Sequence, residues 1–263
     1  MNNLILFDVD GTLTEARSGI STKMLRALRE LCRYAEVGFL TGSSLEYIKE
    51  QLWPALNDPI IKHNCHLLPC NGTEYLITDG DEEIIFNTIS RSIMEDELGY
   101  GATQRLFQIL CAFQAEIIQE YSFPLAGDFV QNRISMINWC PIGRASDREA
   151  RKAFKIIDQN NNIRAKYIKK LENIVKDEKI GVTVKLGGDT SFDIFPTGWD
   201  KTFALNHFDK NSWNFWFVGD RCYPQGNDYE IFSFLKDSGC AYETSGPEET
   251  LEIIDFHILR EFQ

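Results

Sequence analysis

Leu4-Ile5-Leu6-Phe7-Asp8-Val9-Asp10-Gly11-Thr12-Leu13 is the stretch that decides the fold. Its four leading apolar residues are typical of a central strand in a parallel sheet, buried on both faces. Ligands bind such sheets at the carboxyl ends of the strands, where Asp8 and Asp10 follow. One carboxylate can attack phosphorus and hold Mg²⁺, while its neighbour exchanges protons with a sugar or water oxygen. The stretch predicts catalytic residues of phosphoryl transfer, with a plain Asx-type turn as the alternative.

The composition indicates a protein with a sizeable core and a negative surface. Of 263 residues, 43% are hydrophobic, and the formal net charge is −12. This charge argues against nucleic acid and anionic membranes as partners, so an anionic substrate needs a local group of cations. No apolar run approaches the roughly 20 residues of a membrane span, and Met1-Asn2-Asn3 lacks the basic start of a signal peptide. We expect a cytoplasmic protein, whose seven scattered cysteines are reduced core residues.

The pattern after the first strand predicts a strand, a helix and a second strand. Apolar residues recur at helical spacing over residues 21–34, and an apolar run at 37–40 reads as a strand. Thr41 follows that run, with a hydroxyl and backbone N–H groups that suit a phosphate. The alternative for this element is a capping box of Ser43 and Glu46, and both roles can coexist.

The middle of the chain predicts an inserted module. Asp79-Gly80 between two β-type runs indicates a hairpin, and we place a domain boundary after residue 88. Helices segregated on an antiparallel sheet give a two-layer α+β arrangement. The expected helices are 103–119, 147–158 and 163–176, with a polar loop at 159–162, and the expected strands are 134–139, 182–186 and 191–195. The predicted fold class is therefore α/β: a Rossmann-like parallel-sheet core, 1–88 and 198–263, with an inserted α+β module at 89–197.

Three arginines in this module offer positive charge. Arg133 is expected to begin a strand, Arg144 follows the turn at Pro141-Ile142-Gly143, and Arg151 lies early in the next helix. Guanidinium groups bind phosphate oxygens in a bidentate manner, so the three could hold a second phosphate. The alternative is that they are ordinary solvated charges.

The last third returns to the pattern of the core. Lys201 follows Asp200, a candidate helix cap, and could neutralise a phosphoryl group beside Asp8. An apolar run over 213–218 ends at Gly219-Asp220, and Gly226-Asn227-Asp228 follows. A carboxylate at the end of a strand suits Mg²⁺, which takes oxygen ligands.

These motifs resemble those of the haloacid dehalogenase (HAD) superfamily of phosphatases and phosphomutases. Within it, the chain is similar to the eukaryotic-type α-phosphomannomutase family over nearly its whole length. The motifs that carry the resemblance are Phe7 to Thr14 with Ala16-Arg17, Pro141 to Arg144, Ser191 to Pro196, and Gly198 to Lys201. The chain departs from the family pattern at Gln131 to Ser135, at Gln225 and after Phe232.

The resemblance implies roles for individual residues. Asp8 would be the phosphorylated nucleophile and Asp10 the general acid/base, assisted by Thr41 and Lys201. Mg²⁺ would be held by Asp8, Asp220 and the main-chain carbonyl of Asp10. The sugar phosphate would be bound by Arg17, Arg133, Arg144, Arg151, Ser191 and Asp193.

The implied reaction interconverts mannose 6-phosphate and mannose 1-phosphate, with a hexose 1,6-bisphosphate as activator. The resemblance also implies a homodimer joined through its caps. A Mg²⁺-dependent HAD sugar-phosphate phosphatase remains the alternative, because the same core residues serve both reactions.

Overall fold

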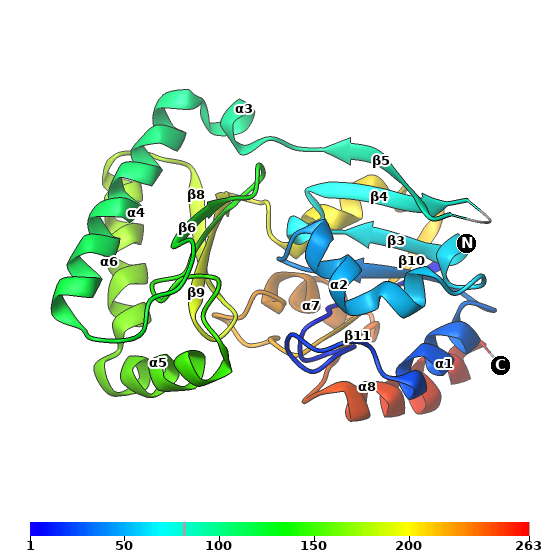
Figure 1. Ribbon diagram of the computed structural model, residues 1–263. Coiled ribbons are helices and arrows are strands. Elements are labelled where there is room, and N and C mark those ends of the chain that lie inside the picture. Colours follow the sequence, from blue (N-terminus) through cyan, green and yellow to red (C-terminus); the bar gives the residue numbers. More distant parts are fainter. Residues whose placement is uncertain (81–82, 263) are drawn as a thin grey trace. The chain divides into compact units, whose positions relative to one another are not determined.

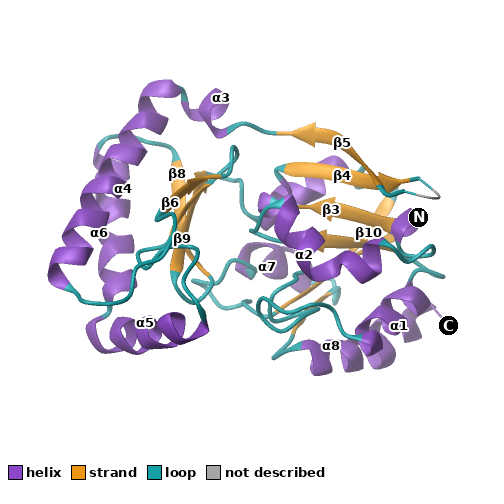
Figure 2. Cartoon of the chain, in the orientation of Figure 1, coloured by secondary structure: helices purple, strands orange, loops and turns teal. Residues whose placement is uncertain are grey.

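The computed structural model describes residues 1–80 and 83–262, and Figure 2 shows their helices and strands. The chain divides into two compact units. We call Met1–Arg91 together with Trp199–Gln263 the core unit, and Ser92–Gly198 the inserted unit. Among the described residues, we find no helix with the length and hydrophobicity to cross a membrane.

The core unit is built on a mixed, mostly parallel sheet. Its strand order within the described residues is β11-β10-β1-β2-β3-β4-β5, and the five strands from β11 to β3 run parallel. The hairpin predicted at Asp79-Gly80 is confirmed, because β4 and β5 pair antiparallel. The strands are β1 (Asn2–Phe7), β2 (Glu36–Leu40), β3 (Cys65–Leu68), β4 (Glu74–Asp79), β5 (Ile85–Arg91), β10 (Trp213–Gly219) and β11 (Ala241–Glu243).

Apolar side chains cover both faces of this sheet, as expected for a buried parallel strand. Ile5 and Phe7 pack on one side with α1, α2 and α8, whereas Leu4 and Leu6 pack on the other with η3 and α7. Figure 1 shows α1 beside α8, and the two helices are in contact. The helical elements are α1 (Thr22–Leu31), α2 (Leu45–Leu56), η1 (Lys62–Asn64), η2 (Cys70–Gly72), η3 (Lys201–His207), α7 (Tyr229–Lys236), α8 (Pro247–Ile253), η4 (Ile254–Ile258) and η5 (Leu259–Phe262).

The inserted unit has the predicted two-layer α+β arrangement. An antiparallel sheet of order β6-β7-β9-β8 has α4 and α6 on the same side (Figure 1). Trp139 stacks on Phe192 with ring centroids 4.4 Å apart, and both side chains are buried. The elements are α3 (Met94–Leu98), α4 (Tyr100–Glu120), β6 (Val130–Asn132), β7 (Ile137–Trp139), α5 (Arg148–Asn161), α6 (Ile163–Asp177), β8 (Val182–Gly187) and β9 (Ser191–Pro196).

Four local predictions were wrong. Arg133 does not begin a strand: it lies in the turn between β6 and β7. The expected loop over 159–162 is helical up to Asn161, and Asn162 alone, with φ of 51°, separates α5 from α6. The N-cap of α2 is Ser44, so Ser43 does not head a capping box. Cys111 is exposed, although the other cysteines are buried or partly buried.

Candidate active site

The first strand delivers the nucleophile candidate directly to the edge of the sheet. β1 ends at Phe7, and the Asp8 N–H still donates to the Val218 carbonyl of the neighbouring β10, at 2.9 Å. The chain then turns, because the N–H groups of Leu13 and Thr14 both donate to the Val9 carbonyl at 3.0 Å. Asp8 is therefore fixed by the sheet on one side and by this turn on the other.

A glycine allows two parts of the site to approach each other closely. Gly11 has φ of +84°, which side chains with a Cβ rarely adopt. A Cβ placed there would also collide with the Asp220 carboxylate, which follows β10. The glycine of the Asp-x-Asp-Gly string thus lets the Asp220 side chain approach the turn that follows Asp8.

Lys201 lies between two carboxylates. Its Nζ donates to Asp8 Oδ1 and to Asp228 Oδ1, and the lysine side chain is completely buried. Burial alone would lower the pKa of Lys201, but the carboxylates of Asp228 and Asp8 raise it above its ordinary value, so the ammonium stays charged. Asp228 is a site residue that the sequence did not predict, although its motif Gly226-Asn227-Asp228 follows the strand that ends at Gly219.

The site holds more negative than positive charge. Asp8, Asp220 and Asp228 each offer an oxygen, and these oxygens lie within 4.8 Å of one another. Burial raises the pKa of Asp8 well above its ordinary value, and Lys201 opposes this rise. Burial and the Asp228 carboxylate raise the pKa of Asp220 to about 6. These three carboxylates outnumber the two nearby cations, Lys201 and the Arg221 guanidinium, whose Nε lies 3.7 Å from Asp220 Oδ2, so the site favours a further cation.

Oxygen atoms around this cluster fit a hard divalent cation. Asp220 Oδ1 and Asn227 Oδ1 are buried, and neither has a hydrogen-bond partner among the described residues. A buried acceptor without a donor is unfavourable, and a bound cation would satisfy it. The acidic cluster is therefore a candidate metal site.

Asp10 and Thr41 lie at the same edge of the sheet. The Asp10 carboxylate accepts a hydrogen bond of 2.9 Å from the backbone N–H of Arg17, whose φ is 59° and whose side chain is exposed. Thr41 follows β2, the parallel neighbour of β1, and its hydroxyl accepts from the Ser43 N–H at 3.1 Å. Within the core unit, Lys201 contacts Asp8, and an oxygen of Asp220 lies within 4.8 Å of one of Asp8. Asp10 and Thr41 lie at the same edge of the sheet, and the catalytic roles of all five residues stay predictions.

The three predicted arginines of the inserted unit have different surroundings. Arg151 is held by the protein, since its guanidinium donates to the carbonyls of Ser146 and Arg144, both at 3.0 Å, and to Thr190 Oγ1 at 2.6 Å. Arg144 is half-buried after the Gly143 turn, and Arg133 Nε donates to Gln131 Oε1 at 3.1 Å. Arg151 therefore fixes the loop that presents Arg144.

Ser191 and Asp193 lie on β9, on the strand face opposite the stacked Phe192. Both are buried, and Asp193 Oδ1 accepts a hydrogen bond of 2.7 Å from Asn138 Nδ2 on β7. Ser191 Oγ donates to the Gly187 carbonyl on β8. These bonds fix the orientation of both side chains within one sheet.

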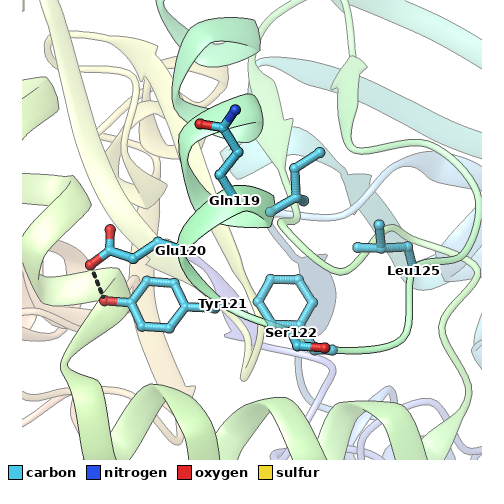
Figure 3. Close-up of a pocket in the computed structure, with 7 residues that line it drawn as sticks. Gln119, Glu120, Tyr121, Ser122 and Leu125 are labelled. Carbon is cyan, nitrogen blue, oxygen red and sulfur yellow. Dashed lines mark hydrogen bonds between the residues drawn. The ribbon is translucent and has the colours of Figure 1, made fainter.

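A pocket in the inserted unit contains none of the predicted site residues. Its volume is about 360 Å³, and it lies where α4 ends (Figure 3). The Tyr121 hydroxyl donates to Glu120 Oε1 beside it, at 2.9 Å. The lining residues are Ile118, Gln119, Glu120, Tyr121, Ser122, Phe123 and Leu125.

Parallel strands, an Asp-x-Asp turn after the first of them and a lysine buried between carboxylates define a HAD-like protein. Solved structures agree on the fold. A Plasmodium falciparum IMP-nucleotidase is 16% identical with a TM-score of 0.62, over 96% of this chain and 67% of that one. The C-terminal domain of a C. albicans trehalose-6-phosphate phosphatase is 16% identical with a TM-score of 0.56, over 96% and 91%.

The chain belongs to the eukaryotic phosphomannomutase family, whose model matches residues 23–260. A phosphomannomutase of Schizosaccharomyces pombe is 34% identical over 94% of this chain and 91% of its own length. A phosphomannomutase of Saccharomyces cerevisiae is 32% identical over 95% of this chain and 92% of its own length. A probable phosphomannomutase of Caenorhabditis elegans is 33% identical over 98% and 96%.

Proposed function

We propose that this protein is a phosphomannomutase that interconverts mannose 6-phosphate and mannose 1-phosphate. Family membership and relatives of that name, aligned over nearly the full chain, support the assignment. The observation that carries it is the contact of Lys201 with both Asp8 and Asp228, beside Asp220. This arrangement places a buried ammonium next to the carboxylate that would receive the phosphoryl group.

Asp8 is the nucleophile in the proposed reaction. One of its carboxylate oxygens forms a bond to phosphorus of a hexose 1,6-bisphosphate, and the bond from phosphorus to the sugar oxygen breaks. Asp10 donates a proton to that leaving oxygen and so releases a hexose monophosphate. When a monophosphate presents its free hydroxyl, Asp10 removes the proton, and the phosphoryl group returns from Asp8 to the sugar.

The polar groups around Asp8 supply charge and position. Lys201 neutralises negative charge on the transferred group, and the Thr41 hydroxyl binds one of its oxygens. Mg²⁺ would be held by Asp8, Asp220 and the main-chain carbonyl of Asp10, and it would supply charge stabilisation at the phosphoryl oxygens. The orphaned oxygens of Asp220 and Asn227 support this cation.

The inserted unit, Ser92–Gly198, would act as the cap, for which the sequence predicts the bounds 89–197. Arg133, Arg144 and Arg151, together with Ser191 and Asp193, would bind the sugar and its second phosphate, and Arg17 would join them from the core unit. A mutase needs such a site because its intermediate carries a phosphate at each end. Bidentate binding by guanidinium groups suits that task. By the same resemblance, we propose a homodimer joined through the caps. The cytoplasmic location expected from the sequence stays a prediction.

A Mg²⁺-dependent assay tests the function. Mannose 1-phosphate is supplied with and without catalytic glucose 1,6-bisphosphate, and mannose 6-phosphate and free phosphate are followed together. We expect isomerisation that depends on the bisphosphate, with little release of phosphate. Release of phosphate without isomerisation would instead identify a sugar-phosphate phosphatase on the same framework.

A further inference from the structure

A turn between β3 and β4 has an unusual backbone. Cys70, Asn71 and Gly72 follow one another with φ of 50°, 64° and 80°. Residues other than glycine rarely adopt this left-handed region, although asparagine tolerates it better than most. Three such residues in succession persist only where surrounding contacts fix them, and such sites often serve a function.

One set of contacts ties the turn to the end of β2. The Cys70 N–H donates to the Ser43 carbonyl at 2.9 Å, and the Asn71 N–H donates to the Thr41 carbonyl at 2.8 Å. Asn71 is 3% exposed, so these bonds are shielded from water. The turn therefore fixes the loop that presents the Thr41 hydroxyl.

A second set ties the same turn to η3. Asn71 Nδ2 donates to the Trp199 carbonyl at 3.2 Å, just before the lysine that begins η3. Gly72 packs directly on this helix, because a Cβ at Gly72 would lie 2.5 Å from the Ala204 Cβ. At the other end of η3, His207 Nε2 donates to the Gly72 carbonyl at 2.6 Å.

We propose that Asn71 is a positioning residue for phosphoryl transfer. Its main-chain N–H holds the Thr41 loop, and its side-chain amide holds the chain two residues before Lys201. Lys201 and the Thr41 hydroxyl bind the same phosphoryl group in the reaction proposed above, on which this inference rests. Asn71 thereby sets their separation without touching the substrate. Glycine would satisfy the backbone of the turn, whereas asparagine adds a donor that reaches Trp199.

Two substitutions remove the amide donor. Asn71→Gly adopts the left-handed conformation without strain and keeps the bond to Thr41, so we expect it to fold. Asn71→Asp keeps the size but places an acceptor against the Trp199 carbonyl. The matched control is Asn57→Gly, whose amide donates to the Trp53 carbonyl at 3.0 Å, where α2 ends.

The measurement is kcat and KM for sugar-phosphate turnover, with the melting temperature of each variant. We expect both Asn71 variants to lose about tenfold or more in kcat, with KM within about twofold, because small misplacements of catalytic groups are costly. Asn57→Gly should retain the wild-type kcat. If both Asn71 variants keep kcat while melting earlier, or change KM alone, the residue serves the fold only and the inference is wrong.

A second readout does not depend on turnover. Beryllium fluoride with Mg²⁺ mimics a phosphoryl group on an aspartate, and we expect it to raise the melting temperature of the wild type and of Asn57→Gly. The rise should be smaller in Asn71→Gly, and an equal rise would refute the inference. The identity of the product that the wild type forms tests the proposed function. The kcat of the Asn71 variants relative to that of the wild type tests the role of Asn71.

Discussion

Replacing Lys201 by methionine should destabilise the core unit strongly. Lys201 is fully buried and donates to two carboxylates, of which Asp8 is 4% exposed and Asp228 is 0% exposed. Methionine fills similar space but leaves both acids without their counter-charge. Removing one partner from a buried ion pair costs about 3–5 kcal/mol, and we expect a loss of that size in the free energy of unfolding.

The loss should depend on pH in a defined direction. Burial raises the pKa of Asp8, and removal of the ammonium that opposes this effect raises it further. An acid whose folded pKa lies above its unfolded value destabilises the fold at pH values above the folded pKa. The penalty of Lys201→Met is therefore fully present at alkaline pH and shrinks as falling pH protonates the acids.

The assay is urea unfolding in EDTA at pH 8 and pH 6, followed by tryptophan fluorescence. Lys152→Met is the control, because Lys152 forms only an exposed ion pair with Glu149, at 3.2 Å. This variant should unfold at the same urea concentration as the wild type. A loss below about 1 kcal/mol for Lys201→Met at pH 8 would refute the electrostatic account of the site. So would a penalty that grows as the pH falls.

Three further predictions concern other parts of the structure. Gly11→Ala should weaken activation by Mg²⁺ at least several-fold, because its Cβ meets the Asp220 carboxylate; an unchanged Mg²⁺ titration would contradict this. Arg151→Lys should raise KM for the sugar phosphate, since lysine cannot reproduce the three bonds that hold the Arg144 loop; steady-state kinetics test it. Burial lowers the pKa of His207, so the free energy of unfolding should fall as the pH drops below about 6.5. In thermal melts at pH 7.5 and 5.5, the melting temperature of His207→Gln should therefore fall less than that of the wild type.

The sequence predicts the elements of the core unit well because its signals are local and agree with one another. The apolar run before Asp8 specifies β1, and the helical spacing after Ser21 specifies α1. The start of α1 is capped as the sequence suggests, since the Ser21 side chain accepts from the Met24 N–H at 3.2 Å. Parallel pairing then carries Asp8, Thr41 and Asp220 to one edge without further information.

Local sequence patterns mispredict secondary structure where a hydrogen bond from a nearby side chain determines the backbone conformation. The apolar residues spaced from Ile134 to Trp139 favour a strand, but the Asn132 side chain accepts from the Ile134 N–H at 2.8 Å and closes a turn. Asparagines at 159–161 favour a loop, yet Asn161 donates back to the Ile157 carbonyl at 2.9 Å and the helix continues. The role of Asp228 could not be predicted, because its partner Lys201 lies 27 residues earlier in the chain and no local pattern links the two.

The bond between Lys201 and Asp8 joins residues 193 positions apart. On the ribosome, at about 5–20 residues per second, the first strand therefore emerges roughly 10–40 seconds before its ammonium partner. During that time β1 also lacks β10, which pairs along one of its edges. We expect protease to cut β1 in ribosome-bound chains that end before residue 200, and to spare it in released protein. Because β1 is synthesised first, its apolar side chains and its edge toward β10 stay without their partners until the last third of the protein is made.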